Sequence, residues 1–185
     1  MYAEAYARFT ARQHDATVLL LATSLETALK SYISEKGGAL LQYMLDKMAS
    51  PSLESLLVAS MDYCGLNAPK DFKKWITALR LKRNEIAHKP TITDVDPLEV
   101  GRWIGVVEAI LSALEGETID DSIGFIISPV GEKAKEKFSN GTLGVILRME
   151  PYISMPPYHV LMSTGETYRM NKSSFEIVTK HKFNP

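Results

Sequence analysis

The sequence predicts an α+β protein, in which an all-α bundle of four or five helices precedes a small β-barrel. Two observations carry this prediction. From about residue 11 to 115 apolar residues recur at steps of three and four, the spacing of one helix face. After Gly116 they occur instead in short runs rich in β-branched and aromatic residues, separated by turn signals such as Asn140-Gly141. We therefore expect two domains, at 1–116 and 117–185.

Residues that typically end or begin helices separate the expected helices of the first domain. Gly37-Gly38 ends the long first helix, Ser50-Pro51-Ser52 stops one helix and starts another, and Pro97 opens the last. The expected helices cover residues 11–36, 39–48, 53–63, 71–88 and 97–115.

The second domain is expected to contain five short strands, which suffice for a small curled sheet or barrel. Their expected positions are 123–127, 142–149, 158–162, 167–170 and 175–178.

Composition is that of an ordinary globular protein, with 45% apolar and 23% charged residues and a net charge of −1. The single cysteine, Cys64, excludes an internal disulfide and a cysteine-based zinc site, and we interpret it as a small buried side chain. The amino terminus lacks the apolar core of a signal peptide, and the longest apolar run, 18–22, is too short to span a membrane. A cytoplasmic location without membrane contact is therefore expected.

Positive charge is concentrated near the middle of the chain. Residues 70–89 include seven basic and two acidic side chains, a local net charge of +5. Such a run is typical of a solvated helix face, but it is also what a polyanion partner requires.

Arg83 interrupts the apolar stripe of the helix that this run forms. At 100° per residue it falls in the centre of the stripe that contains Ile76 and Leu79. A guanidinium does not lose its charge and is costly to bury alone. We therefore expect Arg83 either to pair with an acid inside the bundle, with Glu26 as the candidate, or to face a second molecule.

Asn84 and His88 lie one turn apart on the neighbouring flank of the same helix. Pro90 forces the chain out of helical geometry, so His88 is expected near the helix end, where its ring can reach solvent. A purely structural interpretation is also open, in which His88 interacts as a cation with the carboxyl end of the helix.

The string Arg83-Asn84-Glu85-Ile86-Ala87-His88, near the end of the penultimate helix of a bundle, resembles the signature of the HEPN family. The resemblance covers roughly residues 11–115 and rests on this motif and on helix order. Many HEPN proteins are metal-independent ribonucleases that act as homodimers, with two Arg/His motifs facing each other across a cleft. Others are non-catalytic modules for dimerisation or for binding nucleic acid or protein. The resemblance implies one of these two functions.

In the ribonuclease interpretation the RNA supplies its own nucleophile, the 2′-hydroxyl, and no metal or other cofactor is needed. Arg83 would hold the scissile phosphate, and His88 would act as general acid or base, because imidazole exchanges protons near neutral pH. Asn84 would orient His88 or bind the phosphate. Basic neighbours expected to attract the RNA backbone are Arg80, Lys82 and Lys89.

The second domain resembles an SH3-like barrel, on the strength of Gly-x-Val/Ile in one strand, a Gly-containing hairpin, and a Lys-Ser-Ser turn into Phe-Glu-Ile-Val. Such barrels commonly bind nucleic acid or protein, so we expect this one to hold the substrate or a partner, such as an antitoxin in a toxin–antitoxin or defence system. Tyr152, Tyr158 and Tyr168 would then stack on bases. The alternative is that these tyrosines only cap a small core.

Overall fold

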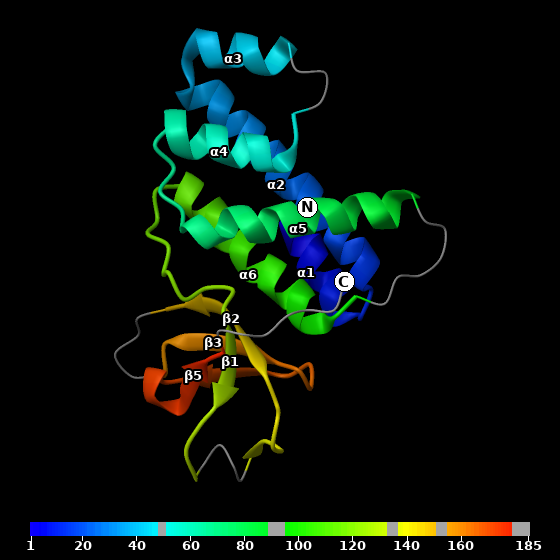
Figure 1. The fold of residues 1–185 in the computed structure, drawn as a ribbon, viewed down its shortest axis with the longest axis vertical. Coiled ribbons are helices and arrows are strands. Elements are labelled where there is room, and N and C mark those ends of the chain that lie inside the picture. Colours follow the sequence, from blue (N-terminus) through cyan, green and yellow to red (C-terminus); the bar gives the residue numbers. More distant parts are fainter. Residues whose placement is uncertain (48–50, 89–94, 133–136, 151–154, 179–185) are drawn as a thin grey trace. The chain divides into compact units, whose positions relative to one another are not determined.

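The computed structural model describes residues 1–47, 51–88, 95–132, 137–150 and 155–178. Within them the chain forms six α-helices and a five-stranded antiparallel sheet, so the predicted α+β class is confirmed (Figure 1). Tertiary contacts group Met1–Asp94 with Val107–Ile119 in one compact unit, and Val95–Val106 with Asp120–Pro185 in the other. Helix α6, Pro97–Leu114, is thus shared between the helical unit and the sheet unit. The domain boundary at Gly116 stays a prediction.

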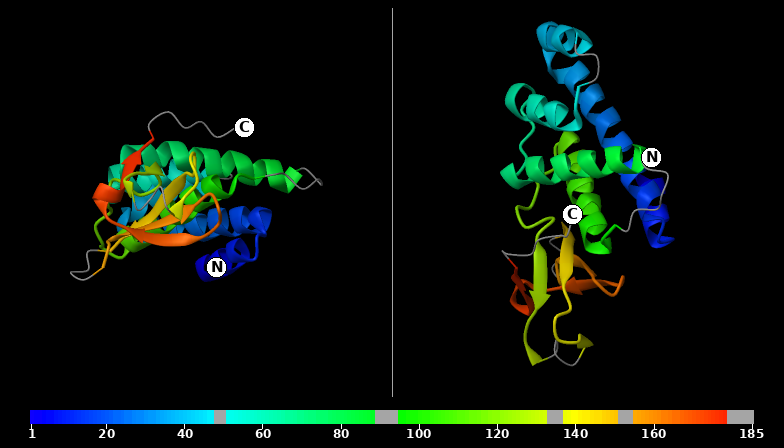
Figure 2. Two further views of the ribbon diagram at one scale, coloured as in Figure 1. Left: turned by 90° about the horizontal axis from the view of Figure 1, so that it is seen from below. Right: turned by 45° about the vertical axis from the view of Figure 1, so that its right-hand side comes forward.

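Helix α2 is the centre of the helical unit, and helices α1, α4 and α5 pack against it (Figure 1). Their bounds are α1 Tyr2–Thr10, α2 His14–Lys36, α3 Gly38–Lys47, α4 Leu53–Tyr63 and α5 Lys70–His88. The predicted apolar stripe of the long helix is confirmed, because its leucines and isoleucine are fully buried; these are Leu21, Leu25, Leu29 and Ile33. The right-hand view of Figure 2 shows α5 running across α2, so the two helices meet over a limited length.

Helix α1 was not predicted. Its sequence has no stripe of branched aliphatic residues, and Ala5 is its one buried residue. It is separated from α2 by Arg12, whose φ of 57° breaks helical geometry. Tertiary interactions hold it in place, including a hydrogen bond of 2.8 Å from the Tyr2 hydroxyl to Glu108 Oε2. A short helix stabilised in this way carries little signal in local sequence.

Helix α3 agrees with the prediction in position but buries no side chain. Three of its apolar residues are exposed, namely Leu40, Tyr43 and Met44.

The sheet unit contains strands β1 Ile126–Pro129, β2 Gly144–Met149, β3 Tyr158–Met162, β4 Thr167–Met170 and β5 Phe175–Ile177, in the order β4-β3-β2-β1-β5. Strands β3 and β4 lie where the sequence predicts them. Strand β1 begins three residues later than expected, because residues 121–124 form a turn. In that turn the Ser122 amide donates to Asp120 Oδ1 at 2.8 Å, and Gly124 has a φ of 83°.

The first half of α6 packs closely on the sheet within this unit. A Cβ placed on Gly101 would lie 2.5 Å from Leu161 Cδ2, and one placed on Gly105 would lie 2.7 Å from the Leu147 carbonyl oxygen. Both glycines therefore let the helix backbone approach β2 and β3 more closely than any side chain allows. Trp103, on the same half of α6, is 1% exposed.

In the described part of the chain, no helix combines the length and the apolar character that crossing a bilayer requires.

Candidate functional site

Helix α5 carries the predicted site into the helical unit through its apolar face. Phe72, Ile76 and Leu79 are fully buried, and the helix packs on α2 and α4. Arg83 follows Leu79 by one turn on this face and is half-buried rather than enclosed. The core therefore ends at Leu79, and the next turn of α5 lines a pocket.

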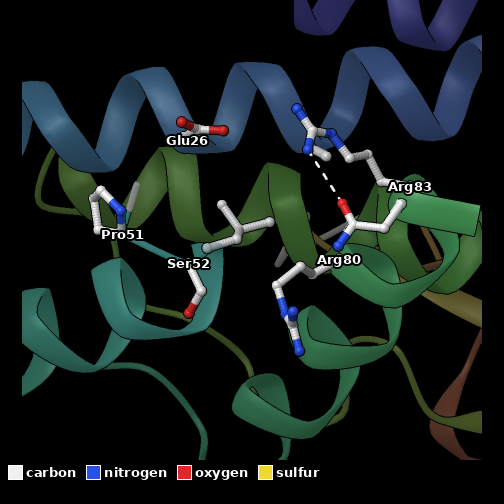
Figure 3. A pocket seen from close by; sticks show the side chains of 8 residues that line it. Glu26, Pro51, Ser52, Arg80 and Arg83 are labelled. Atoms are coloured by element: carbon white, nitrogen blue, oxygen red, sulfur yellow. Dashed lines mark hydrogen bonds between the residues drawn. The ribbon is translucent and has the colours of Figure 1, made fainter. Parts of the chain in front are cut away.

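This pocket, of about 260 Å³, lies between three helices of the helical unit (Figure 3). It will be called the arginine pocket. Helix α5 contributes Arg80, Arg83 and Asn84. The other lining residues are Ala22 and Glu26 of α2, and Pro51, Ser52 and Leu53 at the start of α4.

Within the arginine pocket, Arg83 interacts with its neighbour in sequence. Its Nη1 donates to Asn84 Oδ1 at 3.2 Å, the dashed line in Figure 3, and the Arg83 side chain reaches toward α2. Adjacent helix residues rarely face each other, and this contact depends on the length of the arginine side chain. Asn84 therefore accepts a hydrogen bond from the Arg83 guanidinium in this structure, whereas the sequence suggested that Asn84 would contact His88 or a phosphate.

Glu26 does not pair with Arg83, although it lines the same pocket. Its Oε1 lies 2.6 Å from Lys30 Nζ, in an ion pair along α2. Among the described residues no acidic side chain lies within ion-pair distance of Arg83 or Arg80. The pairing of Arg83 with Glu26, one of the alternatives raised by the sequence, is thus not the arrangement found. Two guanidinium groups line the pocket, and no acid in the described part of the chain pairs with either.

His88 lies apart from Arg83. It is exposed at the carboxyl end of α5 and is not among the residues that line the arginine pocket. Five residues of helix correspond to about 7.5 Å along the axis and about 140° around it, so the two side chains leave α5 in different directions. One chain therefore brings together Arg80, Arg83 and Asn84 but leaves His88 outside.

The basic neighbours differ in their availability. Lys82 Nζ lies 3.2 Å from Glu85 Oε2, and its side chain is only 16% exposed. Arg80 lines the pocket, and its buried Nε has no hydrogen-bond partner. Lys89 lies outside the described residues. Of Arg80 and Lys82, the two that the structure describes, Arg80 is the one that shares a pocket with Arg83.

The chain gave no significant match to a protein-family model, to a curated protein or to a solved structure. The comparisons identify no family. Among the described residues, no three His, Cys, Asp or Glu side chains form a group that could hold a metal ion.

The sheet unit has a second, smaller pocket of about 190 Å³, lined by Lys137, Phe138, Tyr168 and Arg169 together with five other residues. The Tyr168 ring meets Phe138 edge-on at 5.1 Å between ring centres, and Lys137 Nζ lies 4.1 Å from the Tyr168 ring centre. Of the other tyrosines named above, Tyr158 meets buried Phe175 edge-on, and Tyr152 lies outside the described residues. The described rings therefore contact other side chains in the sheet unit.

Glu150 is the centre of a charged cluster beside β3 and β4. Its carboxylate accepts hydrogen bonds from Arg169 at 2.9 Å and His159 at 3.1 Å, and pairs with Arg148 at 3.1 Å. Burial raises the pKa of Glu150, but the hydrogen bonds and the positive charges outweigh it, so that this pKa is lowered overall. Burial and the Arg148 charge lower the pKa of His159 despite the opposing effect of Glu150.

We expect the sheet unit to lose stability in two steps as the pH falls. A group whose pKa is lower in the folded state takes up protons first in the unfolded chain, so stability is present above the unfolded pKa and lost below it. The His159 step begins below about pH 6.5 and the Glu150 step below about pH 4.5. Urea unfolding of a Trp75→Phe protein, followed by fluorescence of the buried Trp103, measures both steps.

Single substitutions separate the two steps. His159→Gln should remove the upper one, and Glu150→Gln should remove the lower one. A urea midpoint that stays constant from neutral pH to below pH 4.5 would contradict the prediction.

Proposed function

We propose that the protein is a metal-independent endoribonuclease of HEPN type that acts as a homodimer. The observation that carries this proposal is the arginine pocket, where two guanidinium groups lie beside Asn84 and pair with no acid among residues whose placement is described. Paired guanidinium groups suit phosphate, which they bind through charge-assisted and often bidentate hydrogen bonds. Arg83 and Asn84 are also the first two residues of the RNxxAH string on which the resemblance rests.

The chemistry assigns roles to His88 and Arg83. A base removes the proton of the RNA 2′-hydroxyl, the oxygen attacks the adjacent phosphorus, and the 5′-oxygen of the next nucleotide leaves with a proton. The products are a 2′,3′-cyclic phosphate and a free 5′-hydroxyl. His88 moves the proton, because imidazole both accepts and donates protons near neutrality. Arg83 stabilises the extra negative charge of the transition state.

The position of His88 supports the proposal of a dimer. In one chain this residue is exposed and leaves α5 in a direction different from Arg83. A complete site then combines Arg83 of one copy with His88 of a second copy, as an isologous contact with twofold symmetry allows. Basic residues of α5 that remain exposed add attraction for the RNA backbone without sequence preference.

We propose that the sheet unit is an SH3-like barrel that binds the substrate or a protein partner. The antiparallel order and the 3₁₀ turn η1, Lys172–Ser174, leading directly into β5 support this assignment. The pocket around Tyr168, with Lys137 and Arg169 beside it, is the part of the unit best suited to a polar, negatively charged partner.

A non-catalytic module that binds nucleic acid or protein is the second candidate. The observation in its favour is the separation of His88 from the arginine pocket. In that case the pocket binds an anionic partner and no bond is broken.

Incubation with bulk tRNA and with a short single-stranded RNA in EDTA distinguishes the two functions. The ribonuclease proposal requires cleavage that leaves cyclic-phosphate ends and that disappears in Arg83→Ala protein purified in parallel. RNA that is retained on the protein but stays intact supports the binding module. If the RNA is neither cleaved nor retained, both proposals are contradicted.

A further inference from the structure

Arg80 stands out among the residues that the predicted motif does not include. It precedes Arg83 by one turn of α5 and lines the same pocket. Its Nε is buried and without a hydrogen-bond acceptor, which is uncommon for a polar group inside a protein. No acidic side chain of the described residues neutralises its charge. Among the residues that the structure describes, this guanidinium is therefore held in the pocket without an acidic partner and with an unsatisfied Nε.

The wall opposite α5 also favours an anion. Helix α4 begins at Leu53, and its N-cap Ser52 accepts a hydrogen bond from the Ser55 amide at 3.1 Å. Ser52 and Leu53 both line the pocket, so the positive end of the α4 dipole is directed toward it. The one acidic lining residue, Glu26, is paired with Lys30.

The two arginines do not converge on a single point. Figure 3 shows the Arg83 guanidinium directed toward α2, whereas the Arg80 side chain leaves α5 in another direction. Positions three apart on a helix differ by about 4.5 Å along the axis. A single free phosphate would need both groups to turn inward. A nucleic-acid strand carries a phosphate at every nucleotide, so two of its phosphates can contact the two guanidinium groups without such a rearrangement.

We infer that the arginine pocket binds two successive phosphates of one RNA strand, with Arg83 on the phosphate to be cleaved and Arg80 on its neighbour. This inference rests on the proposed function for the identity of the strand. It adds a positioning role for Arg80: the second phosphate fixes the register of the strand, so that the scissile phosphate lies at Arg83.

The test measures binding and needs no cleavage. The probe is a fluorescent 2′-O-methyl RNA, which lacks the attacking hydroxyl, prepared as a series in which one linkage at a time is a neutral methylphosphonate. Anisotropy gives its affinity for the full chain and for Arg80→Ala. Lys74→Ala is the matched control, because Lys74 is an exposed basic residue of the same helix outside the pocket.

We expect neutralisation of either of two adjacent linkages to weaken binding by the unsubstituted protein about tenfold. Arg80→Ala should bind the all-phosphate probe about tenfold more weakly and become insensitive to one of those two linkages, as a double-mutant cycle requires. Lys74→Ala removes one exposed charge of α5, so it should weaken the binding of every probe equally and keep both sensitivities. If Arg80→Ala responds to both linkages as the unsubstituted protein does, the inference is wrong.

A second variant separates the pocket from a general effect of charge. Ala22→Leu places extra side-chain volume in the pocket from α2 and leaves both arginines in place. It should weaken binding of the all-phosphate probe by about the same factor as Arg80→Ala. Circular dichroism checks that the helices of this variant are intact. Unchanged binding by a folded Ala22→Leu protein would show that Arg80 acts outside the pocket and would overturn the inference.

The outcomes also distinguish this inference from the proposed function. If Arg80 contributes to linkage-specific binding but natural RNA is not cleaved, the two-phosphate inference is supported and the ribonuclease proposal is wrong. If Arg80→Ala cleaves RNA at the same rate and position as the unsubstituted protein, the ribonuclease proposal is supported and the two-phosphate inference is wrong.

Discussion

His88→Ala is expected to lower RNA cleavage by about 10²–10⁴-fold, the usual contribution of a positioned general acid or base. The same change should leave the helical unit folded. His88 is exposed at the end of α5, where substitutions typically change stability by no more than about 0.5 kcal/mol. Loss of cleavage in this variant would therefore report on chemistry. Initial rates on a single-stranded RNA in EDTA, with thermal unfolding measured on the same samples, provide the comparison.

Mixing two inactive variants tests where the site lies. If each site combines Arg83 of one copy with His88 of the other, subunit exchange between Arg83→Ala and His88→Ala gives mixed dimers with one intact site. About half of the dimers are then mixed and about a quarter of the activity returns. If both residues of a site came from one chain, the mixture would stay inactive. Activity of His88→Ala alone would remove His88 from the mechanism.

The largest expected effect on stability comes from Gly105→Ala in α6. Helix propensity alone predicts stabilisation by about 1 kcal/mol, because alanine is the better helix former. The packing predicts the opposite. The new Cβ would lie 2.7 Å from the Leu147 carbonyl oxygen and 3.0 Å from Leu147 Cα, and backbone atoms cannot turn away as a side chain can. We expect net destabilisation of the sheet unit by about 2 kcal/mol, within the range for overpacked cores.

Urea unfolding followed by Trp103 fluorescence measures this change, again with Trp75 replaced by phenylalanine. Ser112→Ala is the control, since it raises helix propensity on the same helix at a residue that belongs to the helical unit. The control should be neutral or slightly stabilising. A Gly105→Ala protein that is also stabilised would show that α6 does not approach β2 as closely as described.

The fold was predictable where the local pattern and the tertiary structure agree. The stripe through Leu21, Leu25 and Leu29 identified α2 because one face of a long helix must be buried. Strands β3 and β4 were predicted at their observed positions because turn residues bound them on both sides. Helix α1 was missed because contacts distant in sequence, such as Tyr2 with Glu108, stabilise it.

The candidate site was predictable only in part, for a similar reason. Helix arithmetic placed Arg83 in the apolar stripe of α5, and in the structure Arg83 follows buried Leu79 by one turn and lines the pocket. It could not identify Asn84 as the partner of Arg83, because neighbouring helix positions usually diverge. Nor could it find the pocket, since α2, α4 and α5 each supply part of its wall from separate stretches of sequence.

The division of α6 between the two units has a consequence for how such a protein evolves. Recombination exchanges domains most easily when each carries all the elements that it needs. Here a cut at the end of α6 would remove the sheet and leave Gly101 and Gly105 on a helix without the strands that they approach. A cut before α6 would take from the helical unit the residues from Val107 onward. Bundle and sheet are therefore expected to be inherited together, and substitutions on either side of this helix to be selected jointly.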